Sequence, residues 1–288
     1  MSATALALVV CAAVLHATWN GLAKRASDSL AFLWITTCCS AAMTLPLGVA
    51  ELRASGLAPA AVPFVLATTV LHAVYFYALG RAYAAGAFSL VYPVARGLGV
   101  ALVPPAALLA LGERLSPLGS VGVALVAAGI VALHLAPGTG AGSATAGTDR
   151  VAAIRWAVLT GLSIAGYSLV DKAGVARIHP VPYFMLMEAG TVAVLLPAAL
   201  RRRAAVCREW RAHWPRVVVA AACTAGAYIM VLFAFRLSKA GYVVAARELS
   251  IVLSAVVGSL WFREGALTPR LAGAAVVMAG VACVALAR

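Results

Sequence analysis

The stretch YPVARGLGVALVPPAALLALGERLSPLGSVGVALVAAG, residues 92–129, returns in a second version 151 residues later. Four residues recur at that spacing: Arg96, Glu113, Gly122 and Gly129 correspond to Arg247, Glu264, Gly273 and Gly280. Both versions lie within apolar runs that are too long for ordinary soluble helices. The pattern therefore indicates a duplicated membrane module. In secondary transporters, duplicated modules of this kind meet at a central site.

The composition places the chain in a lipid bilayer. Of its 288 residues, 64% are hydrophobic and 11% are charged, and the mean hydropathy is +1.00. This is too little polar surface to coat a soluble globule of this size. A spanning helix needs roughly 20 mainly apolar residues. Ten such runs are present, at 3–23, 30–50, 61–80, 87–111, 118–136, 152–171, 182–200, 215–235, 241–262 and 268–287.

The predicted fold is an all-α polytopic membrane protein built from two five-helix halves, residues 1–136 and 151–288. They are joined by PGTGAGSATAGTDR, residues 137–150, whose small residues predict a flexible linker. The segment HATWNGLAK, residues 16–24, also aligns with IAGYSLVDK, residues 164–172. Because each half has an odd number of spans, the second half is expected to be inverted in the membrane relative to the first.

The charged residues and the first apolar run predict the location and orientation of the protein in the membrane. The first run lacks a basic leading region, so we interpret it as a retained helix and not a secretory signal. The densest basic group lies between residues 201 and 216, and the positive-inside rule makes that loop cytoplasmic and both termini external. The net charge of +13 has no groove-reading or stacking motif beside it, so anionic lipid is the expected partner and nucleic acid is not. The predicted location is the inner, cytoplasmic membrane.

No pattern predicts catalysis, a cofactor or a metal. The six cysteines have neither disulfide nor metal-ligand spacing, and His16 and His72 have no third ligand at suitable spacing. A nucleotide-binding glycine loop, a nucleophile elbow and a zinc motif are all absent from the sequence. We therefore do not expect an enzyme. The function that remains is transport, either coupled to an ion gradient or by simple exchange.

The two repeated arginines are the main candidates for binding a solute. Arg96 lies about nine residues, or roughly 14 Å, into its run, which is near the middle of the hydrocarbon core. A charge there costs at least about 2.5 kcal/mol when it faces lipid, so Arg96 is expected to face a wet cavity or a partner. Pro93 can open a break beside it and expose N–H groups to an anionic group. Arg247 is expected to approach the same cavity. The alternative is that Arg96 pairs with a helix-end carbonyl or snorkels.

Polar and aromatic side chains in several runs complete the predicted binding site for a small solute. Aromatic faces, amides and imidazoles line pockets for organic molecules, although Tyr and Trp are equally expected at membrane interfaces. The candidates are His16, Trp19, Asn20, His72, Tyr75 and Tyr167.

Three acidic residues are candidates for proton coupling, since a partly buried carboxylate beside a cavity can take up a proton. Glu188 is the first choice because it sits within an otherwise apolar run, and Asp171 and Glu248 are the others. The alternative for Glu188 is an ion pair with Arg236 or Arg247.

The paired glycines predict close helix packing. Gly122 and Gly129, like Gly273 and Gly280, are seven residues apart and therefore share one helical face. The partner helix lies either in the same fold or in a second protomer, so a homodimer is one possibility.

Together these motifs resemble the EamA-type branch of the drug/metabolite transporter superfamily over nearly the whole chain. The resemblance rests on HATWNGLAKR at 16–25, YPVARG at 92–97, LGERLSP at 111–117, and the echoes AARELS and FREGALTP in the second half. It implies alternating-access movement of small organic metabolites, often amino-acid-like or toxic solutes, usually outward. HATWN is also similar to a subgroup linked to phosphonate utilisation. A phosphonate-associated uptake transporter, a flippase for lipid-linked intermediates and a non-transporting membrane scaffold stay open as alternatives.

Overall fold

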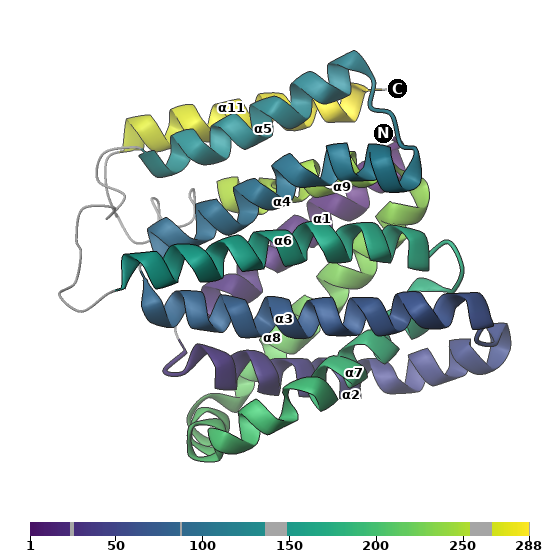
Figure 1. Ribbon diagram of the computed structural model, residues 1–288, viewed down its shortest axis with the longest axis vertical. Helices are drawn as coiled ribbons and strands as arrows, with labels where there is room; N and C mark the ends of the chain where they lie inside the picture. The colour runs from purple at the N-terminus through teal and green to yellow at the C-terminus, as the bar shows by residue number, and fades with distance from the viewer. Residues whose placement is uncertain (24–25, 87, 136–148, 254–266, 288) are drawn as a thin grey trace.

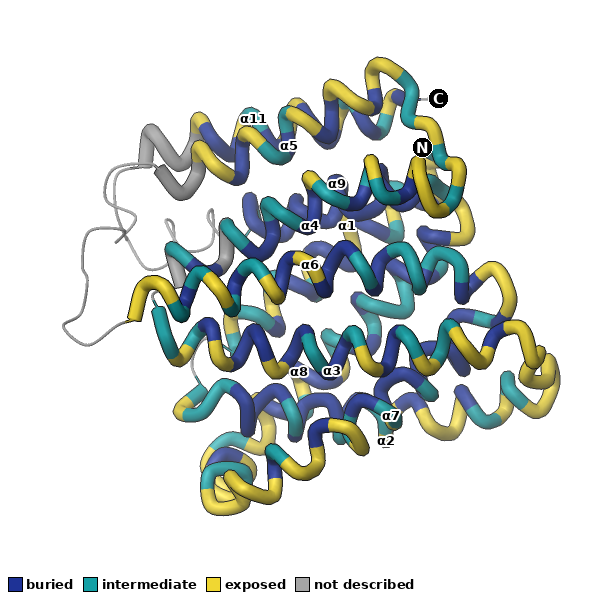
Figure 2. Tube along the Cα trace, in the orientation of Figure 1, coloured by how far each residue is buried: buried dark blue, intermediate teal, exposed yellow. Residues whose placement is uncertain are grey.

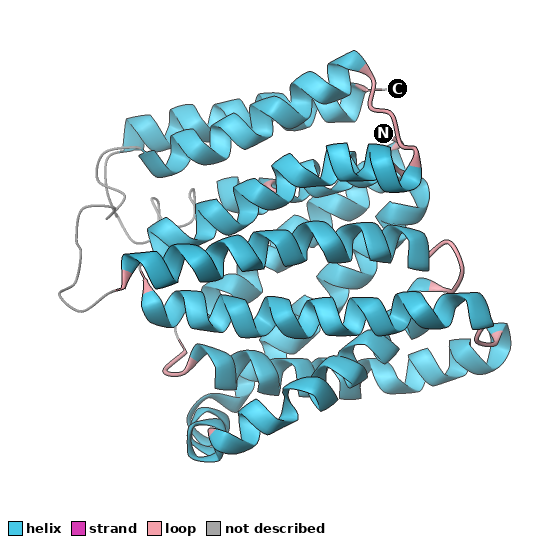
Figure 3. Ribbon diagram, viewed as in Figure 1, coloured by secondary structure: helices cyan, strands magenta, loops and turns pink. Residues whose placement is uncertain are grey.

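The computed structural model describes residues 1–23, 26–86, 88–135, 149–253 and 267–287. Over these ranges the chain is helical and contains no strand, as Figure 3 shows. Seven of the described helices are long and apolar enough to cross a membrane, and the apolar parts of two further helices, Pro117–Ala132 and Ala272–Leu286, are shorter. The protein is therefore an all-helical, multi-pass integral membrane protein.

The helices follow the predicted apolar runs closely. The first half contains α1 (Ala3–Ala23), α2 (Ser29–Ser55), a short 3-10 turn η1 (Pro59–Ala61), α3 (Val62–Ala85), α4 (Phe88–Leu111) and α5 (Pro117–Leu135). The second half contains α6 (Arg150–Gly174), α7 (Pro180–Arg201), α8 (Arg203–Leu237), α9 (Ala240–Arg247) and α11 (Leu267–Leu286). The predictions at Glu264 and over residues 254–262 of the ninth run fall outside the described residues.

Local sequence explains where several helices begin and end. Asp28 precedes α2, and its Oδ1 accepts a hydrogen bond from the Ala31 N–H at 3.0 Å. Asp149 caps α6 in the same way through the Ala152 N–H. These carboxylates satisfy N–H groups that have no partner within their own helices. Gly56 ends α2 with a φ of 71°, a left-handed conformation that glycine adopts without steric cost.

The segment between the seventh and eighth spans is helical, whereas the sequence suggested a polar loop there. Helix α8 already begins at Arg203 and is interrupted only at His213, whose φ of −139° breaks the helical path. Pro215 follows two residues later and cannot donate to the preceding turn, which accounts for a kink at this place. The arginine-rich stretch before it is rich in strong helix formers, so it continues as a helix outside the apolar run.

Helices of one half pack mainly against helices of the other half (Figure 1). The principal pairs are α1 with α8, α3 with α6, α2 with α7, and α5 with α11. Contacts between α4 and α6 are matched by contacts between α1 and α9, and contacts between α2 and α8 by those between α3 and α7. The two halves are therefore interleaved and do not form separate bundles.

Many large apolar side chains are exposed, and Figure 2 shows where exposed residues lie along the helices. Leu109 is 87% exposed, Leu286 is 73% exposed and Leu66 is 62% exposed. Broad apolar surfaces of this kind are rare on soluble monomers and are what contact with lipid tails requires. The buried side chains lie on the inward faces of the helices and surround the site described below.

Glu113 and Lys172 tie one end of the bundle together. Glu113 Oε2 accepts a hydrogen bond from the Ala240 N–H at 2.7 Å and so caps the start of α9. Lys172 Nζ lies 3.5 Å from Glu113 Oε1 and donates to the carbonyl oxygens of Ser238, at 2.8 Å, and Phe235. These bonds satisfy carbonyls at the end of α8. The repeated GER turn therefore joins the end of α4 to the connection between α8 and α9.

Candidate functional site

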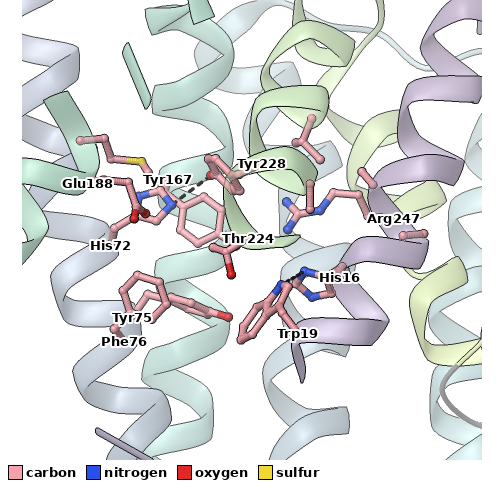
Figure 4. A pocket seen from close by; sticks show the side chains of 15 residues that line it. His16, Trp19, His72, Tyr75, Phe76, Tyr167, Glu188, Thr224, Tyr228 and Arg247 are labelled. Carbon is pink, nitrogen blue, oxygen red and sulfur yellow. Dashed lines mark hydrogen bonds between the residues drawn. The ribbon is translucent and has the colours of Figure 1, made fainter. Parts of the chain in front are cut away.

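A small cavity lies at the centre of the bundle, between helices of both halves (Figure 4). Its volume is about 40 Å³. On the order of three water molecules fit such a space, so an organic solute requires some of the surrounding side chains to move. The lining residues are Ala12, Ala13, His16, Trp19, His72, Tyr75, Phe76, Tyr167, Met187, Glu188, Thr224, Ala227, Tyr228, Val231 and Arg247.

Aromatic rings form much of the cavity wall. The rings of His72 and Tyr167 are stacked, with centroids 4.3 Å apart. Tyr75 meets Tyr167 edge to face at 5.6 Å, and Tyr228 meets His72 edge to face at 5.2 Å. Such contacts fix the ring positions, since each ring supports the next. The cavity therefore offers flat π faces to a bound molecule and little freedom to collapse.

Trp19 separates this cavity from a second one. The second cavity has a volume of about 170 Å³ and is lined by Trp19, Asn20, Ala23, Ser29, Leu33, Leu79, Tyr83 and Gly86. Trp19 Nε1 donates a hydrogen bond to His16 Nδ1 at 3.1 Å, which holds the indole in place. Asn20 lines only the second cavity and donates to the His16 carbonyl oxygen at 2.9 Å. Trp19 therefore lines both cavities, whereas Asn20 lines only the second.

Arg247 enters the central cavity from a break in its helix. Helix α9 ends at Arg247, Glu248 forms a turn, and helical backbone resumes at Leu249. The Arg247 guanidinium carbon lies 5.6 Å from the centre of the Tyr228 ring, and the side chain is buried. A cation at the carboxyl end of a helix is favoured by the helix dipole. Discontinuous helices that present polar groups at mid-membrane are typical of transporter binding sites.

Arg96 does not line the cavity but pairs with Glu248. Its Nη2 lies 2.6 Å from Glu248 Oε1, and its Nε donates to Oε2 at 3.0 Å. Both side chains are buried, and this two-point geometry is the strongest form of an arginine–carboxylate contact. Helix α4 runs without a break from Phe88 to Leu111, so the opening predicted at Pro93 is absent and the break lies instead after Arg247. The two repeated arginines thus have different surroundings.

Glu188 lies in the cavity wall without a full set of partners. Its side chain is 1% exposed, and its Oε2 has no hydrogen-bond partner in the described part of the chain. None of the ion pairs formed by the described residues joins Glu188 to Arg236 or Arg247. The Thr224 hydroxyl, also in the wall, is likewise buried without a partner. Buried polar groups of this kind cost free energy unless a ligand or a proton satisfies them.

Asp171 lies just behind the cavity wall and is surrounded by hydroxyl groups. The Thr68 hydroxyl donates to Asp171 Oδ1 at 2.5 Å, and the Tyr183 hydroxyl donates to the same oxygen at 2.8 Å. The Tyr228 hydroxyl donates to Oδ2. Asp171 is fully buried, so these donors replace the water that a carboxylate would otherwise bind. Tyr228 and His72 connect this carboxylate to the cavity.

The paired glycines lie between α5 and α11. A methyl group added to Gly122 would lie 2.7 Å from the Gly280 carbonyl oxygen, and one added to Gly280 would lie 2.7 Å from the Gly122 carbonyl oxygen. One added to Gly129 would lie 3.1 Å from the carbonyl oxygen of Gly273. The glycine faces therefore meet within one chain, where the absence of side chains lets the two backbones approach closely.

The structure brings most of the predicted binding residues together and adds others. His16, Trp19, His72, Tyr75, Tyr167, Glu188 and Arg247 share the central cavity, whereas Asn20, Arg96, Asp171 and Glu248 lie beside it. Sequence reasoning missed Phe76, Thr224 and Tyr228. Tyr228 had a usable signal, because it is the one tyrosine within the apolar run 215–235.

Comparison with known proteins shows a shared fold and a similarity to one transporter family. The crystal structure of another protein aligns over 99% of this chain and 97% of its own chain. The TM-score is 0.76 and the sequence identity is 18%. That likeness shows a shared fold. No curated protein sequence matches the chain. The model of the EamA-like transporter family matches residues 151–286, which include Tyr167, Asp171, Glu188, Tyr228 and Arg247. This match to the second half of the chain supports an EamA-type transporter of the drug/metabolite transporter superfamily.

Proposed function

We propose that the protein transports a small zwitterionic metabolite, of the size of an amino acid, across the cytoplasmic membrane by alternating access. The observation that carries the proposal is the pair of opposite charges in one aromatic cavity. Arg247 and Glu188 lie on opposite sides of this cavity (Figure 4). A zwitterion carries a carboxylate for the arginine and an ammonium group for the glutamate.

Each end of the cavity has the chemistry that such a solute needs. A guanidinium forms two parallel hydrogen bonds to a carboxylate, and Arg247 has no acidic partner among the described ion pairs. The Glu188 carboxylate offers a buried acceptor to an ammonium group. Aromatic faces attract cations and apolar chains alike, and His72, Tyr167 and Tyr228 lie between the two charges. Binding would offset the desolvation that both charges suffer in the bundle.

The interleaved helices support alternating access through an inverted repeat. If each helix is replaced by its counterpart in the other half, the α1–α8 pair becomes the α6–α3 pair. In the same way, the α4–α6 pair becomes the α9–α1 pair. Both members of each exchanged pair are in contact. Two halves related in this way can rock about a central site and expose it to either face in turn. The ten-span inverted topology is part of the proposal.

The second cavity suggests how a solute enters from the cytoplasm. It lies where α1 ends and α2 begins, and Arg202 binds Asp28 at that same end with a distance of 2.7 Å. The basic segment 201–216 is therefore on the side of this cavity, and the positive-inside rule makes that side cytoplasmic. Trp19 then stands between the cytoplasmic space and the binding cavity. Export is the direction that this arrangement favours.

Charge-removing substitutions in the cavity test the proposal by counterflow into liposomes that contain the purified protein. The panel pairs zwitterionic amino acids with their decarboxylated amines, their deaminated acids and an aminoalkylphosphonate. Arg247→Gln is expected to weaken uptake of every solute that carries an acid group by at least about tenfold, since truncating one partner of a buried charge pair costs about 2–5 kcal/mol. Glu188→Gln should instead weaken the uptake of the solutes that carry an amine.

Arg236→Gln is the matched control, because Arg236 is an exposed arginine at the end of α8. It should leave the selectivity of counterflow unchanged. Equal losses for amines and acids in Arg247→Gln would remove the charge assignment. Scrambling of lipid-linked molecules without flux of any soluble member of the panel would favour the flippase alternative.

A further inference from the structure

A closed ring of hydrogen-bonding groups connects the cavity to Asp171. It runs from Thr68 and His72 of α3 to Tyr228 of α8, then to Asp171 of α6 and back to Thr68. His72 Nδ1 lies 3.0 Å from both the Thr68 hydroxyl and the Thr68 carbonyl oxygen. His72 Nε2 lies 3.0 Å from the Tyr228 hydroxyl, whose oxygen also contacts Asp171 Oδ2. The Thr68 hydroxyl closes the ring at Asp171 Oδ1.

The positions of the hydrogens follow from which atoms can donate. A carbonyl oxygen only accepts, so His72 Nδ1 must carry a hydrogen to face the Thr68 carbonyl. In a neutral imidazole the other nitrogen, Nε2, is then bare and accepts. The Thr68 hydroxyl has a single hydrogen, which it donates to Asp171. Every contact up to this point is satisfied.

Tyr228 is where the ring lacks one hydrogen. Its hydroxyl has one hydrogen but lies between two acceptors, the bare His72 Nε2 and the Asp171 carboxylate. With a neutral imidazole and an ionised carboxylate, one of these two contacts has no hydrogen and brings lone pairs together in a buried site. Buried polar contacts of this kind are costly. One additional proton satisfies both contacts.

We propose that this ring is a proton-binding site that takes up one proton, shared between His72 and Asp171. With the proton on His72 Nε2, the imidazolium donates to Tyr228, and Tyr228 donates to the Asp171 carboxylate. With the proton on Asp171 Oδ2, the carboxylic acid donates to Tyr228, and Tyr228 donates to a neutral His72. Both forms contain the same number of protons, and they differ only in the direction of two hydrogen bonds.

The charges around the ring link it to the solute. Arg247 of α9 lies over the Tyr228 ring and interacts electrostatically with His72, while Glu188 of α7 lines the same cavity as His72. Tyr183 of α7 donates to Asp171 from outside the ring. The positive charge of Arg247 opposes a second positive charge on His72, and a solute carboxylate bound to Arg247 would remove that opposition. Solute and proton are therefore expected to strengthen each other's binding.

Movement of α8 provides the release step. Tyr228 is the ring's only member on α8, so a displacement of this helix from α3 and α6 breaks both contacts that need the additional proton. The proton then leaves to water on the side to which the cavity opens. This coupling step rests on the proposed transport function, whereas proton binding by the ring does not.

Infrared difference spectra of the purified full-length protein, recorded in lipid nanodiscs over a pH series without solute, test the proton site directly. The chain has only three aspartates, Asp28, Asp149 and Asp171, and five histidines, so isotope labels on aspartate and histidine separate their bands. In the wild-type protein, the Asp171 and His72 bands should change with one shared midpoint, because interacting groups titrate as a pair.

Two matched substitutions decide the outcome. Tyr228→Phe removes the hydroxyl that lies between two acceptors, so we expect the two bands to separate, with midpoints about one pH unit or more below the shared wild-type midpoint. Tyr183→Phe also removes one hydroxyl donor from Asp171, but it leaves the ring and its missing hydrogen in place, so the shared midpoint should remain. An unchanged midpoint in Tyr228→Phe, or separate bands in Tyr183→Phe, would overturn the proposal.

A third variant keeps the test decisive if Tyr228→Phe fails to fold. In His72→Gln, the side-chain amide supplies an N–H to Tyr228, so Asp171 should lose its pH-dependent band at the wild-type midpoint, and persistence of that band would contradict the ring. The measurement also separates this proposal from the transport proposal. If the protein binds the shared proton but transports no solute, only the transport proposal is rejected. If it transports a solute but does not bind the shared proton, only the proton-site proposal is rejected.

Discussion

Replacing Arg96 with methionine is expected to lower the free energy of unfolding by about 3–5 kcal/mol. The substitution leaves the Glu248 carboxylate buried without the guanidinium that contacts both of its oxygens. Glu248 is 2% exposed, so water cannot replace the lost partner in the folded protein. Denaturant titration in mixed micelles, followed by the loss of helical circular dichroism, measures the change.

The double variant Arg96→Met with Glu248→Leu distinguishes a lost charge partner from lost packing. Replacing both members of a buried ion pair by apolar residues of similar volume is often neutral or stabilising. The double variant should therefore recover most of the stability that the single substitution loses. If it were no more stable than Arg96→Met, the loss would come from packing around α4 and not from the unpaired carboxylate.

The ion pair also explains the position of Arg247. Glu248 occupies the turn that ends α9, and Arg96 anchors that turn to α4. Consecutive residues on a helical turn point in different directions, so fixing Glu248 on α4 leaves Arg247 free to face the aromatic wall. Within the proposed transport function, Arg96 is therefore a positioning residue for Arg247, the charge proposed to face the solute.

The positions of the helices along the chain were largely predictable, because they depend on the composition of long apolar segments. The run 3–23 coincides with α1, and most other runs differ from their helices by a few residues at either end. Two departures have local causes. Arginine, alanine and glutamate favour helix in water as well as in lipid, so α8 extends outside its apolar run to Arg203. The ninth run breaks at Glu248 because a tertiary partner, Arg96, holds that residue.

The site was predictable in its residue types but not in its pairing. Charged, aromatic and histidine side chains in apolar runs are expected to avoid lipid, and Glu188 and Arg247 lie in the cavity wall. Repetition alone, however, treats Arg96 and Arg247 as equivalent. Their roles differ because an acid follows Arg247 and none follows Arg96, where the next residue is Gly97. Which acid meets which base depends on helix rotation, and a single sequence does not contain that information.

Enlarging Gly122 should strongly damage the contact between α5 and α11. In Gly122→Ala the new methyl group would lie 2.7 Å from the Gly280 carbonyl oxygen and 2.9 Å from the Val284 nitrogen, both backbone atoms that cannot rotate away. We expect a loss of about 1–3 kcal/mol for alanine, as for other overpacked sites, and a larger loss for leucine. Gly97→Ala is the matched control, because nothing lies within 4 Å of its added methyl group and alanine favours the helix.

The reciprocal geometry gives this prediction a second, sharper form. Gly122 and Gly280 each present the carbonyl oxygen that blocks a methyl group on the other, so one separation of the helices relieves both clashes. The variant with alanine at both positions should therefore lose less stability than the sum of the single losses, as coupled neighbours do. Denaturant titration of the four proteins measures the coupling. Additive losses would mean that the two glycines act at independent contacts, and then the α5–α11 backbone approach would not be the common cause.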